Sequence, residues 1–214
     1  MDFIKHIIGF DKAGQEAKNS TPSNIKAVFR NIPSLQTKRL LLRKIVPRDC
    51  EDMYEYSCQE LVTRYLLWYP HPSPEFTESY IERLQDDYRG GSFFDWGVVL
   101  PDFKGREKMI GTCGFTELDP ANNRGEIGYV LNPRFWGQGY AVEAAKRVIR
   151  FGFEQLSLNR IDARYMIENE HSAYVMESCS MKFEGIRRQA MYVKGRYRDI
   201  GEYSILRSDY LRDK

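Results

Sequence analysis

The chain has 214 residues, a length that fits one domain or one domain with an extension. Its 32 basic residues are interleaved with 30 acidic ones, and this balance argues against nucleic acid as a direct partner. No apolar run approaches the length of a membrane span, and the first residues lack a signal-peptide cleavage site. We therefore expect a cytoplasmic protein that neither crosses nor binds a membrane.

The cysteine and histidine content argues against a metal site. The four cysteines include no C-x-x-C pair, and the chain has three histidines. We expect the cysteines to be free thiols in a reducing compartment, and we expect no bound metal. The cysteines are Cys50, Cys58, Cys113 and Cys179.

Residues 1–30 are expected to form an N-terminal extension with a short amphipathic helix. Apolar residues recur at helical spacing up to residue 10, and a polar stretch at 19–24 predicts a break. The helix could pack on the main domain or be disordered, or it could form a contact within a homodimer. A third alternative, a helix on a membrane surface, is disfavoured because its polar face is not strongly basic.

From residue 37 to residue 210 the pattern changes to alternating strands and helices, which predicts one domain. Strands are expected at 39–43, 94–99, 109–115, 125–131 and 161–166, with a last β-pair after 183. Helices are expected from Asp49, at 77–88, at 141–156 and near 172–178. The three strands between 94 and 131 follow one another across turn-rich stretches, as in an antiparallel meander. We predict an α+β fold of layered helices on a mixed, mostly antiparallel sheet.

A glycine-rich loop joins the strand at 125–131 to the helix that follows it. Its sequence is Trp136-Gly137-Gln138-Gly139-Tyr140-Ala141. A helix start leaves backbone N–H groups unpaired and carries partial positive charge, and glycine lets a bulky anion approach, so this loop is suited to phosphate. It lacks the Lys-Ser/Thr pair of a P-loop and the third glycine of a dinucleotide fingerprint. Considered alone, it could still be a tight turn with no ligand.

The same loop resembles the acetyl-CoA-binding motif of the GNAT superfamily, a glutamine or arginine followed by x-x-G-x-G/A. Gly139 and Ala141 match the last two positions, and Trp136 replaces the usual first residue. Other stretches resemble the RimJ/RimL-like branch, which modifies the N-termini of ribosomal proteins, and they occur in the same order over residues 37–208. These stretches are Thr37–Arg43, Asn132-Pro133 with Tyr140–Ala144, Glu168–Ser172 and Gly195–Asp199.

This resemblance implies a GNAT fold whose sheet splays at the strands that bind the cofactor, with acetyl-CoA as the acetyl donor. The pantetheine arm would lie in the opening along the backbone of residues 130–132, and the loop amides would bind the pyrophosphate. Asn169 would reach the pantetheine or a phosphate. The residues expected at the cofactor are Val130, Leu131, Asn132, Trp136, Gly137, Gln138, Gly139, Tyr140, Ala141, Asn169 and Ser172.

Two residues are expected to move protons. The acceptor amine must be neutral to attack, and Glu126 is our candidate for the general base, although it could instead be an ion-paired surface residue. The departing thiolate needs a proton, and the resemblance points to Ser172, which could instead cap a helix. Many GNAT enzymes have a tyrosine where this chain has Met176, so Tyr174 is the fallback. A backbone N–H near Leu131 is expected to stabilise the oxyanion.

The acceptor site is expected between the first two helices and the final hairpin. Tyr69 and His71 lie in the family's substrate-shaping loop, and Tyr192 would form the opposite wall. The resemblance implies acetylation of a primary amine, first of all the N-terminal α-amine of a protein of the ribosomal type. Two alternatives stay open: a small amine such as an antibiotic, polyamine or amino acid, and a non-catalytic scaffold that binds CoA.

Overall fold

The predicted meander forms the middle of the sheet in the computed structural model, which describes residues 23–212. Strands β3 (Asp95–Phe103), β4 (Arg106–Asp119) and β5 (Arg124–Leu131) are antiparallel neighbours. The turn between β3 and β4 is Lys104-Gly105, and both residues have a positive φ. The strands therefore extend to within two residues of each other, because a two-residue turn suffices to reverse the chain.

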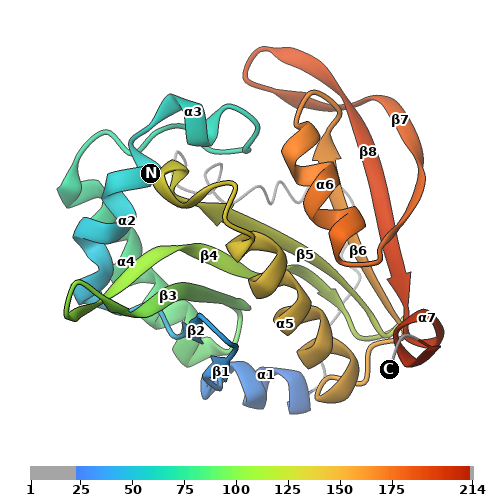
Figure 1. Cartoon of the computed structure of the whole chain (residues 1–214), viewed down its shortest axis with the longest axis horizontal. Helices are drawn as coiled ribbons and strands as arrows, with labels where there is room; N and C mark the ends of the chain where they lie inside the picture. Colours follow the sequence, from blue (N-terminus) through green and yellow to red (C-terminus); the bar gives the residue numbers. More distant parts are fainter. Residues whose placement is uncertain (1–22, 213–214) are drawn as a thin grey trace.

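The sheet has eight strands in the order β1-β2-β3-β4-β5-β6-β8-β7 (Figure 1). Within residues 23–212 every neighbouring pair is antiparallel except β5 and β6, so the predicted mixed and mostly antiparallel sheet is confirmed. The other strands are β1 (Leu35–Gln36), β2 (Leu41–Arg43), β6 (Arg160–Met166), β7 (Lys182–Val193) and β8 (Arg196–Leu206).

The parallel strands β5 and β6 separate soon after they meet. They pair from Arg124 to Glu126 on β5 and from Arg160 to Asp162 on β6. Beyond these residues β5 continues along β4, and β6 continues along β8. The predicted splay is therefore present, and it opens at the carboxyl ends of two parallel strands, where backbone groups face the opening and not a partner strand.

Helices cover both faces of the sheet, with α5 in front and α4 behind in Figure 1. Because side chains alternate along a strand, Val98 packs into the core on the α5 side and Val99 into the core under α2 and α4. The helices are α1 (Ser23–Arg30), α2 (Cys50–Ser57), α3 (Glu60–Thr63), α4 (Pro74–Gly90), α5 (Tyr140–Glu154), α6 (Glu170–Ser178) and α7 (Arg207–Arg212).

The packed part of the chain begins before residue 30. Helix α1 buries Ile25 and Phe29, and the Phe29 ring lies 4.8 Å from that of Phe94 and 5.6 Å from that of Trp96. The end of the expected extension therefore packs on the main domain, because α1 is part of the core. The amphipathic helix expected before residue 19 lies outside the described residues.

The structure also describes the cysteines, the apolarity of the helices and the grouping of metal-ligating side chains. The four cysteines are free thiols. In the part of the chain that the structure describes, no helix has the length and apolarity of a membrane span, and no group of three or more His, Cys, Asp or Glu side chains is arranged to hold a metal ion.

Candidate active site

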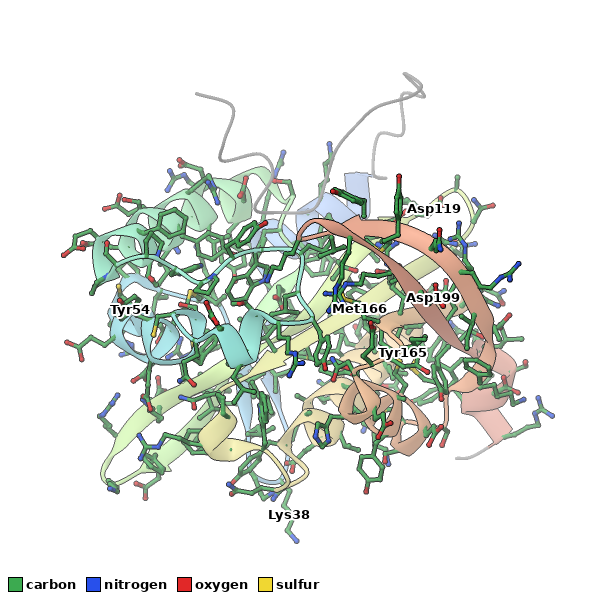
Figure 2. The ribbon with its side chains drawn as sticks, turned by 90° about the horizontal axis from the view of Figure 1, so that it is seen from above. Lys38, Tyr54, Asp119, Tyr165, Met166 and Asp199 are labelled. Carbon is green, nitrogen blue, oxygen red and sulfur yellow. The ribbon has the colours of Figure 1, made fainter. Side chains whose placement is uncertain are left out.

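A cavity of about 650 Å³ connects the splay to the helices α2 and α4 behind the sheet. Glu126 and Tyr129 of β5 line it at the splay, and His71 lines it near α4. Tyr165 and Met166 of β6, labelled in Figure 2, also line it and lie beside the β7–β8 hairpin. One continuous space is therefore in contact with the predicted base and with part of the predicted acceptor site.

Glu126 stands at the last position where β5 pairs with β6, so the splay begins there. Its Oε1 accepts a hydrogen bond from Thr116 Oγ1 at 3.0 Å and lies 2.9 Å from Arg164 Nε. The side chain is only 12% exposed, and this burial raises the pKa of Glu126 despite the attraction of Arg164. A carboxylate with a raised pKa that faces a cavity is suited to accept a proton from a bound amine.

Asn169 and Ser172 are held together at the start of α6. Asn169 Nδ2 donates to Ser172 Oγ at 2.8 Å, and both residues line the cavity. Because this hydroxyl oxygen accepts from Asn169, its own proton remains available for donation. Tyr174 is 68% exposed and does not line the cavity, whereas Met176 is buried and does. This arrangement favours Ser172 over Tyr174 as a proton donor.

Tyr129 is a site residue that sequence reasoning missed. Its hydroxyl donates to the backbone carbonyl of Ser172 at 2.9 Å and joins β5 to α6 across the splay. Burial raises the pKa of Tyr129 above its usual range, so the hydroxyl stays protonated. In the sequence it reads only as an aromatic residue of a strand, and no local signal distinguishes it from core residues.

The glycine loop has the conformation that its sequence predicts. Gly137 and Gly139 have φ values of +72° and +77°, in the region that favours glycine, and a Cβ at Gly137 would meet no other atom within 4 Å. Helix α5 begins at Tyr140, so the N–H groups of Tyr140 and Ala141 have no partner within the helix. The loop therefore offers an open approach to unpaired backbone donors, as a phosphate requires.

The segment before β2 is attached to this loop by polar contacts. Arg39 Nε lies 2.6 Å from Glu143 Oε2, and Arg39 Nη1 donates to the Gln138 carbonyl at 2.9 Å. Thr37 Oγ1 donates to Glu143 Oε1 at 2.6 Å. The guanidinium of Arg39 also lies 4.4 Å from the ring centre of Tyr140. These contacts hold the loop and the start of α5 in one position before any anion binds.

The backbone at 130–132 meets the expectation only in part. The Asn132 N–H donates to the Ile110 carbonyl of β4 at 2.8 Å, so it is directed away from the splay. Groups alternate along an antiparallel ladder, so the preceding N–H and carbonyl of Leu131 face the splay. That carbonyl accepts from Trp136 Nε1 at 2.8 Å. An Asn132 N–H contact to pantetheine is therefore ruled out, and the Leu131 N–H is the group that faces the opening.

The three predicted acceptor residues have different surroundings. His71 lines the cavity, is buried, and has Nδ1 2.8 Å from Thr77 Oγ1. Burial lowers the pKa of His71 to about 4, so the ring is neutral at physiological pH. Tyr69 and Tyr192 are each 66% exposed and are not among the residues that line the cavity. The Lys194 ammonium is 5.1 Å from the Tyr69 ring centre, and the Tyr192 ring lies 5.0 Å from that of Tyr197.

Comparison with known proteins shows which family and which solved structures this chain resembles. The acetyltransferase (GNAT) domain family matches residues 39–182. The uncharacterised N-acetyltransferase YoaA of Bacillus subtilis is 35% identical over 175 residues, which are 82% of this chain and 97% of YoaA. The candidate ribosomal N-acetyltransferase YdaF of the same organism is 28% identical over 186 residues, with coverage of 83% and 96%.

Two further proteins extend the comparison: a relative whose name gives a small-molecule substrate, and a protein of solved structure. The spermidine N(1)-acetyltransferase of Vibrio cholerae is 24% identical over 173 residues, which are 81% of this chain and 96% of that enzyme. The crystal structure of a GNAT-family acetyltransferase from Bacillus anthracis superposes with a TM-score of 0.71 and 28% identity. It covers 82% of this chain and 99% of its own.

Proposed function

This chain belongs to the GNAT family of acetyl-CoA-dependent N-acetyltransferases, and we propose that it acetylates a primary amine bound in the cavity beside Glu126. One observation supports the site above all others. The candidate base Glu126 and the Asn169–Ser172 pair line the same cavity, on the two sides of the splay between β5 and β6. A base for the amine and a proton donor for the leaving sulfur are needed at such a position.

The proposed reaction follows from these positions. Acetyl-CoA supplies an activated acetyl thioester. Glu126 takes a proton from the amine, directly or through water, so that the nitrogen can attack the carbonyl carbon. The Leu131 N–H, which faces the splay, stabilises the negative charge that develops on the carbonyl oxygen. As the carbon–sulfur bond breaks, Ser172 donates its hydroxyl proton toward the sulfur and recovers a proton from solvent.

The glycine loop is proposed to hold the donor. The free N–H groups at the start of α5 would bind the pyrophosphate, and Trp136 and Gln138 complete the loop on either side of Gly137. Asn169 would bind the pantetheine arm or keep Ser172 in place. The fit rests on the positive φ values of the two loop glycines, which leave space beside the backbone.

Two classes of acceptor are proposed. The first is the N-terminal α-amine of a protein, supported by the resemblance to the RimJ/RimL-like branch and to YdaF. The exposed rings of Tyr69 and Tyr192 would then contact residues that follow the reacting amine. An α-amine has a pKa near roughly 8, so about a tenth of it is neutral at pH 7 and it requires little help from a base.

The second class is a small amine, and the shape of the cavity favours it. The space extends from the splay to the side chains of α2 and α4, with the neutral His71 in its lining. A side-chain-type amine has a pKa near roughly 10.4, so less than about a thousandth of it is neutral at pH 7. Such an acceptor depends more strongly on Glu126.

The experiment is a measurement of free CoA release with acetyl-CoA and a panel of N-terminal peptides and small amines. Wild-type protein is expected to release CoA with at least one class, and the ratio of kcat/KM values identifies the acceptor. Binding of acetyl-CoA without release for any acceptor would contradict the proposal and favour a scaffold that binds CoA.

A further inference from the structure

We propose that the acceptor is a small amine with two cationic centres: one is acetylated beside Glu126, and the other is held by the Asp95 carboxylate among aromatic rings. This inference rests on the proposed function, because it names the class of amine that the site takes. It assigns a role to Asp95, which reads in the sequence only as the first residue of a strand.

The carboxylates of Asp95 and Glu126 lie on the same face of the sheet. Asp95 of β3 pairs with Gly114 of β4, and Gly114 pairs with Gly128 of β5, two residues beyond Glu126. Side chains two residues apart point to the same face. Two strand spacings and two residues along a strand separate the Cα atoms of Asp95 and Glu126 by roughly 12 Å. A ligand of small-molecule size can therefore reach both carboxylates.

Two positions between the two carboxylates are glycines, Gly114 on β4 and Gly128 on β5. A Cβ at Gly114 would lie 2.4 Å from the Phe94 carbonyl oxygen, and a Cβ at Gly128 would lie 2.7 Å from Thr116 Cγ2, so neither position has room for a side chain. Asp95, Gly128 and Glu126 all line the cavity. Both acidic groups and Gly128 therefore border one continuous space.

The Asp95 carboxylate accepts hydrogen bonds but has no cationic partner among the described residues. Its Oδ1 accepts from the Trp96 N–H at 3.0 Å, and the Thr112 hydroxyl also stabilises the carboxylate. Across residues 23–212, no lysine or arginine forms an ion pair with it. Burial raises the pKa of Asp95 to about 7. A partly buried carboxylate without a counter-charge is unfavourable, and a cationic ligand group would offset that cost.

The surroundings of Asp95 are suited to a cation. Tyr56 and Tyr80 line the same part of the cavity, and both lie close enough to Asp95 for its charge to raise their pKa values. Aromatic faces attract ammonium groups, most strongly where water is excluded. The hydroxyl of Ser57, which is 1% exposed and lines the cavity, has no hydrogen-bond partner among residues 23–212. The neutral His71 adds no positive charge that would repel the ligand.

The test compares α,ω-diaminoalkanes of three to eight carbons with n-alkylamines of the same lengths and with N-terminal peptides. CoA release is measured for wild-type protein, for Asp95→Asn and for Asp86→Asn. Asp86 makes a matched control, because it is a 66% exposed carboxylate on α4 that pairs with Arg89. We expect kcat/KM for the preferred diamine to exceed that for its monoamine at least tenfold. Asp95→Asn removes this preference, and Asp86→Asn keeps it.

A second readout does not depend on catalysis or on a variant. The preferred diamine is expected to raise the Tm of wild-type protein at pH 8 without acetyl-CoA, and the matched monoamine is not. Equal kcat/KM and equal Tm shifts for diamines and monoamines would overturn the inference, as would higher kcat/KM for peptides than for any diamine. Absence of CoA release with every acceptor is a different outcome, because it contradicts the proposed function itself.

Discussion

The Nε atom of Arg164 on β6 lies 2.9 Å from Oε1 of Glu126 on β5, just where the two parallel strands separate. The guanidinium is 41% exposed, whereas the carboxylate is 12% exposed. Burial raises the pKa of Glu126, and Arg164 opposes that shift. The pKa of the proposed base is therefore controlled by two opposite effects, and each can be changed by one substitution.

In Arg164→Gln, activity is expected to require a higher pH than in the wild-type protein. Loss of the cation raises the pKa of Glu126 further, and the protonated form cannot accept a proton. The acid limb of the kcat/KM profile then shifts to higher pH, while the rate on the alkaline plateau falls less than about tenfold. Kinetics between pH 5 and 9 measure this. A limb that stays in place would show that Arg164 does not act on the base.

Glu126→Gln is expected to lower kcat/KM by about 10²-fold for a small amine of high pKa and by less for an α-amine. The amide cannot accept a proton, and the loss is largest below pH 7, where less of the amine is neutral. The matched control is Glu117→Gln, which removes a neighbouring carboxylate that raises the pKa of Glu126. That variant should retain activity and shift the acid limb slightly to lower pH. An unchanged profile for Glu126→Gln would exclude it as the base.

Gly139→Ala is expected to weaken acetyl-CoA binding at least tenfold. The φ of +77° strains any residue with a Cβ, and the added methyl lies beside the helix start where an anion would approach. Gly195→Ala is the matched control, because its φ of +82° and open surroundings give a similar backbone cost of about 1–2 kcal/mol. Calorimetric titration and denaturation separate the two effects. Equal Kd values for the two variants would contradict a phosphate site in the loop.

Ser172→Ala is expected to lower kcat by about 10- to 100-fold with little change in the Kd of acetyl-CoA, because it removes the proton donor for the leaving thiolate. Tyr129→Phe removes the neighbouring hydroxyl, which donates to the Ser172 carbonyl, and should lower kcat by no more than about threefold. Single-turnover kinetics compare the two variants. A larger loss for Tyr129→Phe would transfer the role of proton donor to Tyr129.

Asp95→Asn is expected to stabilise the ligand-free protein at alkaline pH. The pKa of Asp95 is about 7 in the folded state, above its ordinary value of 3.8, so the folded chain binds the proton more tightly than the unfolded chain. Stability therefore falls as pH rises from about 4 to 7 and then levels off, with a loss of at most about 4 kcal/mol. Urea denaturation should show a gain for the variant at pH 8 and none at pH 4. A gain of equal size at both values would contradict the titration of Asp95.

Several features of this protein follow from the sequence alone, because the interactions that produce them are local. The loop at Trp136–Ala141 combines glycine, which permits positive φ, with the first turn of a helix, so a site for an anion is encoded within six residues. The contact between Asn169 and Ser172 joins residues three apart at the start of a helix, which are neighbours wherever that helix packs. The order of the longer helices and strands follows from periodicity in the same way.

Tertiary structure decided which of these elements meet. Phe29 belongs to the core only because it packs on Phe94 and Trp96, which lie more than sixty residues away in the sequence. Tyr69 and Tyr192 remain exposed, whereas His71, two residues from Tyr69, is buried in the lining of the cavity. Short-range pattern does not distinguish these outcomes, because the burial of a loop side chain depends on helices and strands remote in the chain.

The order of strands likewise decided which side chains share the cavity with Glu126, namely those of Arg164 and Asp95. Alternation along each strand predicts that a side chain points to one of two faces, but it does not say which strand is its neighbour or where two neighbours part. The splay between β5 and β6 follows from pairing that stops at Glu126, a property of the whole sheet. The sequence determined the loop proposed to hold the donor, which is local, and the assembled sheet determined the cavity proposed for the acceptor, which is lined by residues from both halves of the chain.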